Sequence, residues 1–265
     1  LLFVGPVSVQ AKGKQKVDLE LILMADGSGS VEYDEFMLQR RGYARALRSP
    51  TVISAIKNGP LGKIAITYVE WSGAFLQVPI VPWTVVRGAA EIETIAKQLE
   101  TAPRQLEGGG TAVGAAILYG AQALLTNAYD GKRRVIDISG DGPDKDGIPA
   151  SVGRDQAVAQ GITVNALPIL DGRHPGLELF FLDNVIGGPG AFLVVARDFK
   201  DFARAIRKKL ILEIAGLQPA RPSGFIRAQI APPQNVRPAP NGYTYQKGCD
   251  IGERMREGYW ADDDT

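Results

Sequence analysis

The sequence has few of the residues that most often hold metals or form cross-links. Its 265 residues include one cysteine, Cys249, and one histidine, His174. A single cysteine cannot form an internal disulfide or a cysteine-based metal site, and a single histidine excludes a cluster of histidine ligands. A metal site in this chain would therefore be built mainly from oxygen ligands.

The sequence also has neither a large excess of one sign of charge nor a long apolar run. The 30 Lys and Arg residues nearly balance 29 Asp and Glu residues, which leaves a net charge of +1. This balance argues against a surface for nucleic acid. No apolar run reaches about 18 residues, so no transmembrane segment is predicted. The length allows one large domain with an appendage.

The first residues resemble the end of an export signal. Residues 1–11 are apolar and precede the basic stretch Lys12-Gly13-Lys14. Val9 and Ala11 fit the small-residue rule for signal-peptidase cleavage. We interpret residues 1–11 as a signal-peptide remnant and expect a periplasmic or secreted bacterial protein. The alternative is an apolar N-terminus without that role.

Strand-like and helix-like segments alternate between residues 12 and 216. Strands are predicted at 17–24, 63–69, 75–81, 134–139, 162–167 and 191–195, and helices at 33–47, 89–99, 112–125, 152–159, 176–185 and 199–214. This alternation indicates an α/β fold with a doubly wound, mostly parallel sheet and helices on both faces. The short link at 71–74 and the prolines Pro79 and Pro82 predict one antiparallel edge strand.

The pattern changes after Gly216. Prolines interrupt residues 217–265, and neither a helical nor a strand period persists there. We predict that these residues form a Pro-rich C-terminal extension, which either wraps the domain or is disordered.

Five oxygen-bearing residues stand at predicted strand ends or helix starts. Asp26, Ser28 and Ser30 follow the first buried strand, Thr111 follows three glycines before a helix, and Asp141 follows the strand that ends near 139. In parallel sheets these positions meet at one edge, where ligands bind. Two carboxylates and three hydroxyls suit a hard divalent cation, so we predict a Mg²⁺ site, with Mn²⁺ or Ca²⁺ as alternatives.

Each segment also has a simpler explanation. Ser30 could cap the following helix, whose first turn is acidic. Thr111 could cap the helix after a flexible glycine loop, and Asp141 could belong to an ordinary Gly-Asp-Gly turn. The metal interpretation depends on all three segments occurring in the right order and element context.

The pattern Asp-x-Ser-x-Ser after a buried strand, with a distant Thr and Asp, resembles the metal-ion-dependent adhesion site of von Willebrand factor type A domains. The resemblance covers about residues 17–215 and implies a von Willebrand A, Rossmann-like fold. It implies that Ser28 and Ser30 bind the metal directly and that Thr111 binds it when a partner is present. Asp26 and Asp141 would act mainly through ordered waters and by orienting the hydroxyls.

More narrowly, the chain is similar to an uncharacterised exported proteobacterial family of von Willebrand A-like proteins. The stretches that carry this similarity are 39–43, 68–73, 134–142 and 165–169, which read QRRGY, YVEWSG, RVIDISGDG and NALPI.

The expected function is metal-dependent protein binding of an adhesion or scaffold type. A cation held mostly by neutral hydroxyls keeps charge to share, so it would recruit an Asp or Glu of a partner protein. The alternatives are a metal-assisted hydrolase or phosphatase, and a structural role with a vestigial site. We expect no enzyme, because His174 is remote in sequence and both aspartates are engaged with the ion. Trp71, at the same edge, is either a contact residue or a packing residue.

Overall fold

The computed structural model describes residues 13–217 and 225–227. The predicted signal-peptide remnant at 1–11, Cys249 and most of the predicted extension at 217–265 lie outside the described residues. Among the residues described, no helix is both long and apolar enough to cross a membrane.

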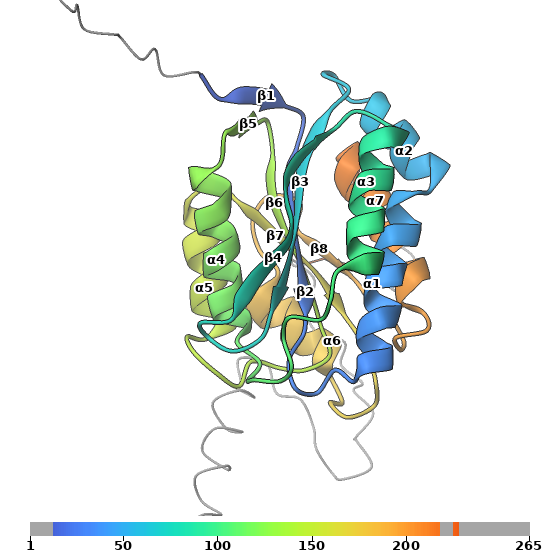
Figure 1. The fold of residues 1–265 in the computed structure, drawn as a ribbon. Helices are drawn as coiled ribbons and strands as arrows, with labels where there is room; N and C mark the ends of the chain where they lie inside the picture. The colour runs from blue at the N-terminus through green and yellow to red at the C-terminus, as the bar shows by residue number, and fades with distance from the viewer. Residues whose placement is uncertain (1–12, 218–224, 228–265) are drawn as a thin grey trace, which may run out of the picture.

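A seven-stranded sheet forms the centre of the molecule, in the order β4-β3-β2-β6-β7-β8-β9 (Figure 1). Its strands are β2 (Glu20–Asp26), β3 (Ile64–Trp71), β4 (Gln77–Val86), β6 (Arg134–Gly140), β7 (Thr163–Pro168), β8 (Phe192–Val194) and β9 (Phe225–Arg227). Five neighbouring strands, β3, β2, β6, β7 and β8, run parallel to one another, which confirms the predicted fold class. The predicted antiparallel edge is β4, paired with β3, and β9 runs antiparallel to β8 at the other edge.

Helices cover both faces of this sheet. The elements are α1 (Tyr33–Leu47), α2 (Pro50–Lys57), α3 (Ala89–Thr101), α4 (Val113–Thr126), α5 (Ala150–Ala159), α6 (Leu177–Phe180) with the π-helical η1 (Phe181–Val185), and α7 (Phe202–Ala215). Figure 1 shows α1, α2, α3 and α7 on one side and α4 and α5 on the other. The short α6 and η1 pack with the second group.

Three elements differ from the sequence prediction. The sequence analysis predicts no helix at 50–57, yet α2 forms there with Pro50 at its first position, where the fixed φ of proline favours a helix start. A short strand β1 (Gln15–Val17) separates from β2 and pairs with β5 (Tyr129–Gly131). Residues 225–227 of the predicted extension form β9, so part of that extension continues the sheet.

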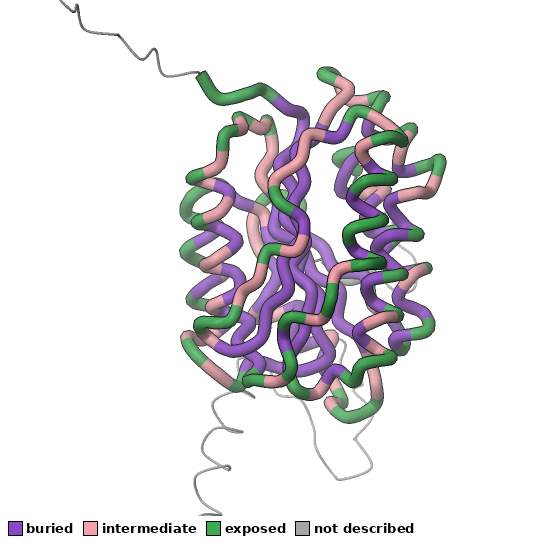
Figure 2. Tube along the Cα trace, in the orientation of Figure 1, coloured by how far each residue is buried: buried purple, intermediate pink, exposed green. Residues whose placement is uncertain are grey.

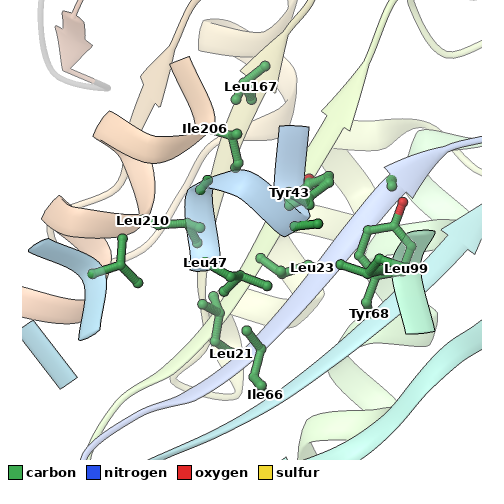
Figure 3. Packing of buried hydrophobic residues seen from close by; sticks show 14 of the residues in the cluster. Leu21, Leu23, Tyr43, Leu47, Ile66, Tyr68, Leu99, Leu167, Ile206 and Leu210 are labelled. Carbon is green, nitrogen blue, oxygen red and sulfur yellow. The ribbon is translucent and has the colours of Figure 1, made fainter. Parts of the chain in front are cut away.

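Each face of the sheet has its own apolar core. All seven residues of β2 are buried, as expected for a central parallel strand (Figure 2). One core packs side chains such as Leu23 and Tyr68 of the sheet against Tyr43 and Leu47 of α1 and Leu210 of α7 (Figure 3). The other lies beneath α4, α5 and η1. These two cores hold the strand ends in fixed positions.

Two glycines allow α4 and α5 to approach closely. A Cβ added to Gly114 in α4 would lie 2.3 Å from the carbonyl oxygen of Ile148, and one added to Gly153 in α5 would lie 2.5 Å from the carbonyl oxygen of Gly114. Both contacts are with backbone, which cannot move aside as a flexible side chain can. The absence of these two side chains therefore sets the spacing of the helices.

We predict that Gly114→Ala destabilises the protein by about 2–3 kcal/mol, the upper range for an overpacked core. An alanine in a helix interior normally stabilises it by roughly 0.5–1 kcal/mol relative to glycine, so the sign is reversed. The control is Gly120→Ala in the same helix, whose Cβ would come nearest to the Ile136 side chain, at 3.2 Å, and not to backbone. Urea denaturation measures both, and equal stability of the two variants would contradict the close-approach model.

A buried ionic cluster joins α7 to β6 and β7. Lys209 Nζ lies 2.6 Å from Asp137 Oδ1 and 2.5 Å from Glu213 Oε1, and Asn165 Nδ2 donates to the same Glu213 oxygen at 3.0 Å. Burial, together with the neighbouring Asp137, raises the pKa of Glu213 to about 8. The single Lys209 ammonium therefore lies between two buried carboxyl groups, and this arrangement favours the protonated form of Glu213.

Glu213 should make stability depend on pH. Its folded-state pKa lies above the ordinary value of 4.5, so its contribution is full below pH 4.5 and is lost as the pH rises through about 8. Glu213→Gln removes this titration, so the melting temperature of the variant should fall less than that of wild type between pH 6 and pH 9. The control is Glu107→Gln at an exposed position. Parallel pH profiles of wild type and Glu213→Gln would refute the assignment.

Candidate metal site

The candidate site lies where the winding of the sheet reverses direction. From β2 the chain passes through α1 and α2 to β3 on one side, while β6 pairs with β2 on the other. Such a reversal leaves a crevice beyond the carboxyl ends of the two central strands. Asp26 ends β2, and Asp141 directly follows β6. Both predicted carboxylates are therefore at the carboxyl ends of the two central strands, and β2 ends at the lower edge of the sheet in Figure 1.

Four of the five predicted residues form one hydrogen-bonded chain. The backbone N–H of Ser28 donates to Asp26 Oδ1 at 2.8 Å, and the hydroxyl oxygens of Ser28 and Ser30 lie 3.1 Å apart. The Ser30 hydroxyl donates to Asp141 Oδ1 at 2.8 Å across 111 positions of sequence. The structure therefore joins the first and third predicted segments side chain to side chain.

Asp26 is fully buried. Its Oδ2 is enclosed without a well-formed hydrogen bond to any described residue. Burial, followed by the nearby Asp141 carboxylate, raises the pKa of Asp26 to about 7, although hydrogen bonds from Ser28 and the Asp141 backbone oppose the change. A buried carboxylate oxygen without a partner is costly, and a cation would satisfy it.

A glycine on β6 makes room for this oxygen. Ala25 of β2 lies opposite Ser139 of β6, so the following residues, Asp26 and Gly140, are neighbours. A Cβ on Gly140 would lie 3.0 Å from Asp26 Oδ2. A larger residue at position 140 would therefore press on the Asp26 carboxylate.

Three buried polar side chains that sequence reasoning missed hold this corner together. Gln39 on α1 donates to the backbone carbonyl of Asp26 at 2.9 Å and accepts from the Ser139 hydroxyl at 2.8 Å. The Tyr43 hydroxyl lies 3.2 Å from the same Ser139 oxygen. Gln39 and Tyr43 are four residues apart in a helix, a spacing that puts both on the face against the strand ends.

Thr111 lies on a neighbouring loop, and none of the described hydrogen bonds joins its hydroxyl to the other four residues. The loop itself is close to them, because Gly29 N donates to the Gly109 carbonyl at 3.2 Å. Thr111 is 5% exposed, and a Cβ on Gly142 would lie 4.0 Å from its methyl group. The second segment is thus adjacent to the first and third, with its side chain beside the residue that follows Asp141.

The loop at 144–147 holds Thr111 in position. The Lys145 and Asp146 backbone N–H groups both donate to the Thr111 carbonyl, at 2.8 and 3.2 Å. Asp144 Oδ1 accepts from Val113 N at 2.8 Å, and Asp146 Oδ2 accepts from Ala74 N at 2.9 Å. The aspartates of this loop therefore serve backbone hydrogen bonds.

The structure argues against the simpler explanation of each segment. Helix α1 begins after Glu32, which forms a capping box with Glu35, whereas the Ser30 hydroxyl bonds to Asp141. Helix α4 has Ala112 as its N-cap, and Asp144 accepts from its first N–H, so Thr111 is not the cap. Asp141 uses its oxygens for long-range partners instead of a local turn.

Arg173 is a charged residue at the site that sequence reasoning missed. Its guanidinium donates to Asp141 Oδ2 at 3.0 Å and to the Ser30 carbonyl at 2.9 Å, and it also pairs with Asp171. Burial raises the pKa of Asp141, and the Ser30 hydroxyl and Arg173 partly oppose that rise. No motif spacing links Arg173 to the site, because it comes from the loop after β7.

The structure places two neighbouring residues whose roles the sequence left open. His174 is remote in sequence, yet a Cβ on Gly142 would lie 3.6 Å from its ring. Burial and the Lys145 ammonium, whose nitrogen lies 3.4 Å from His174 Nε2, lower the pKa of His174 to about 4. Trp71 is fully buried in the core beneath α4, so it is a packing residue and cannot contact a partner.

The oxygen geometry fits a six-coordinate cation. Neighbouring ligands of an octahedral Mg²⁺, with metal–oxygen distances of about 2.0–2.1 Å, lie about 2.8–3.0 Å apart. The separation of 3.1 Å between the Ser28 and Ser30 hydroxyl oxygens is close to that value, and the 2.8 Å between Ser30 and Asp141 is a hydrogen bond that orients the Ser30 hydroxyl. Within residues 13–217 and 225–227, no cluster of three or more His, Cys, Asp or Glu side chains could hold a metal. Ser28 and Ser30 would hold the ion, with Asp26 and Asp141 behind them.

Comparisons with known proteins agree with this fold. The family model described as "Protein of unknown function (DUF1194)" matches residues 16–218. No curated protein matches the chain. Proximal thread matrix protein 1 from the mussel byssus, described with a zinc-occupied MIDAS motif, superposes with a TM-score of 0.57 at 19% identity, over 77% of this chain and 49% of that one.

Two further structures are similar, with slightly lower TM-scores. The pilus adhesin SpaC from Lactobacillus rhamnosus GG gives a TM-score of 0.53 at 16% identity, over 76% of this chain and 32% of that one. A von Willebrand factor type A structure from Catenulispora acidiphila gives 0.52 at 16%, over 75% and 43%. The chain spans about half the length of the mussel protein and less than half the length of the other two. Identities this low show the fold alone, and the fold is von Willebrand A-like.

Proposed function

The chain belongs to the DUF1194 family, and we propose that it is a protein-binding module in which a divalent cation, Mg²⁺ first, recruits a carboxylate of a partner protein. The observation that carries the proposal is the hydrogen-bonded chain from Asp26 through Ser28 and Ser30 to Asp141, with one Asp26 oxygen buried and unsatisfied. When bound, the cation would supply an open coordination position for an anionic oxygen.

The charge balance at the site supports an external anion. The proposed direct ligands, Ser28 and Ser30, are neutral, and Arg173 already neutralises part of the charge on Asp141. A divalent cation held in this way would retain net positive charge. A carboxylate from a partner would complete the charge balance, whereas a neutral ligand would not.

The alternative function is a metal-assisted hydrolase or phosphatase, and His174 is the observation that keeps it open. It lies beside Gly142 and could reach a water near the site. A general base works best when its pKa is near the operating pH, and the pKa of His174 is lowered to about 4. We therefore propose binding without hydrolysis.

We expect Mg²⁺ to raise the melting temperature of the wild-type protein and to leave that of Asp26→Asn unchanged. Asparagine keeps the shape of the buried carboxyl but removes its charge, so the variant should be at least as stable as wild type without metal. Differential scanning calorimetry measures this, first with 5 mM EDTA and then with Mg²⁺ added in steps up to about 1,000 times the Kd. Ligand at about 1,000 times the Kd adds about 4 kcal/mol to the free energy of unfolding.

The matched control is Asp155→Asn, an exposed aspartate on α5. It should respond to Mg²⁺ as wild type does. An equal response of Asp26→Asn and wild type would show that the cation binds elsewhere.

We expect no turnover of p-nitrophenyl phosphate with Mg²⁺ or Mn²⁺ above the rate of the free ions. The physical reason is the low pKa of His174, which makes it a weak base at neutral pH. The measurement is release of nitrophenolate by wild type, Asp141→Asn and His174→Ala. Turnover by wild type that both substitutions abolish would favour the hydrolase instead.

A further inference from the structure

The hairpin between β3 and β4 presents an unusually exposed aromatic side chain. Phe75, at its tip, is 96% exposed, and the adjacent Leu76 is 44% exposed. A single exposed apolar residue is ordinary on a protein surface. Here two other exposed apolar residues, Tyr33 in the first turn of α1 and Val152 in the first turn of α5, stand at helix starts on the same edge of the sheet.

The hairpin tip is held rigidly despite this exposure. Leu76 N donates to the Gly73 carbonyl at 3.0 Å, and Ala74 N donates to Asp146 Oδ2 at 2.9 Å. The Gln77 amide donates to the Gly73 and Ala74 carbonyls at 3.1 and 3.3 Å. An aromatic ring on a fixed support loses little conformational freedom on binding, which favours a contact role.

The tip is tied directly to the loop that carries Thr111. The Ser72 hydroxyl lies 2.8 Å from the Gly108 carbonyl and 3.1 Å from the Gly110 carbonyl. A Cβ on Gly109 would lie 3.2 Å from Leu76 Cδ1, so the Leu76 side chain rests on this loop. Since Gly109 also accepts from Gly29 N, only the glycine loop separates the hairpin from Ser28 and Ser30.

We propose that the partner presents its acidic residue close in sequence to a large apolar side chain, and that this apolar side chain packs on Phe75 and Leu76. The inference rests on the cation-dependent binding proposed above. The cation would bind the carboxylate, and the hairpin would bind the apolar side chain next to it in the partner sequence. Burial of an aromatic ring is worth enough to discriminate between acidic residues that differ only in their neighbours.

A displayed library of random 12-residue peptides tests this recognition without knowledge of the natural partner. The full chain is immobilised, the library is bound in Mg²⁺, and the bound peptides are released with EDTA. We expect the released peptides to share an Asp or Glu within about four residues of a Phe, Leu, Ile, Trp or Met, because four extended residues span roughly 13–14 Å.

The selection separates the two proposals. Peptides enriched in an acidic residue without an apolar neighbour would overturn the role of the hairpin and leave the cation-dependent function intact. If the peptides released by EDTA are not enriched in acidic residues, the proposed function itself is overturned.

Titration of one enriched peptide then assigns the contact to the hairpin. Phe75→Ser should weaken its binding by about tenfold, as expected for an aromatic anchor of moderate strength. The control is Leu61→Ser, a 41% exposed residue in the loop before β3, at the opposite edge of the sheet, and its affinity should equal that of wild type.

A peptide whose apolar residue is replaced by serine should bind wild type and Phe75→Ser equally. The Mg²⁺-dependent rise in melting temperature should be the same in all three proteins, which shows that the substitutions leave the cation site intact. Unchanged affinity of Phe75→Ser for the enriched peptide would refute the proposal.

Discussion

The parallel pairing of β2 with β6 is the constraint on which the rest of the site depends. This pairing sets Ala25 opposite Ser139, and it brings Asp26 next to Gly140 at the carboxyl ends of the two central strands. Because both strands are covered by helices on both faces, a slip in register would expose apolar side chains of two cores at once. The same apolar packing that stabilises the domain therefore fixes the distance between carboxylates that are remote in sequence.

The site combines this rigidity with an unfavourable charge arrangement. Asp26 and Asp141 are buried near one another, and the protein compensates with the Ser30 hydroxyl and the Arg173 guanidinium on Asp141. Asp26 Oδ2 has no such partner within the described structure, and burial, followed by the Asp141 charge, raises the pKa of Asp26 to about 7. An uncompensated buried carboxylate at the end of a central strand is typical of a position that binds a ligand.

The supports around the site come from three parts of the chain. Gln39 reaches the end of β2 from α1, and Ser72 holds the glycine loop from the hairpin. In the loop after β6, Asp144 accepts from the first residue of α4, and Asp146 accepts from the hairpin. Each hydrogen bond contributes only about 1 kcal/mol, but together they leave few alternative arrangements of these loops. The fixed hairpin tip follows from the same network, which is why cation and apolar contacts are proposed to act on one partner segment.

The sequence by itself determined the α/β class, the limits of α1, and four residues that meet at one sheet edge, because these follow from apolar periodicity and from oxygen-bearing residues at strand ends. Tertiary structure alone decided that Ser30 bonds to Asp141 rather than capping α1, and that Trp71 is buried. It also brought Arg173 and His174 to the site. The physical reason is that strand order and loop paths depend on long-range packing, which local periodicity does not encode.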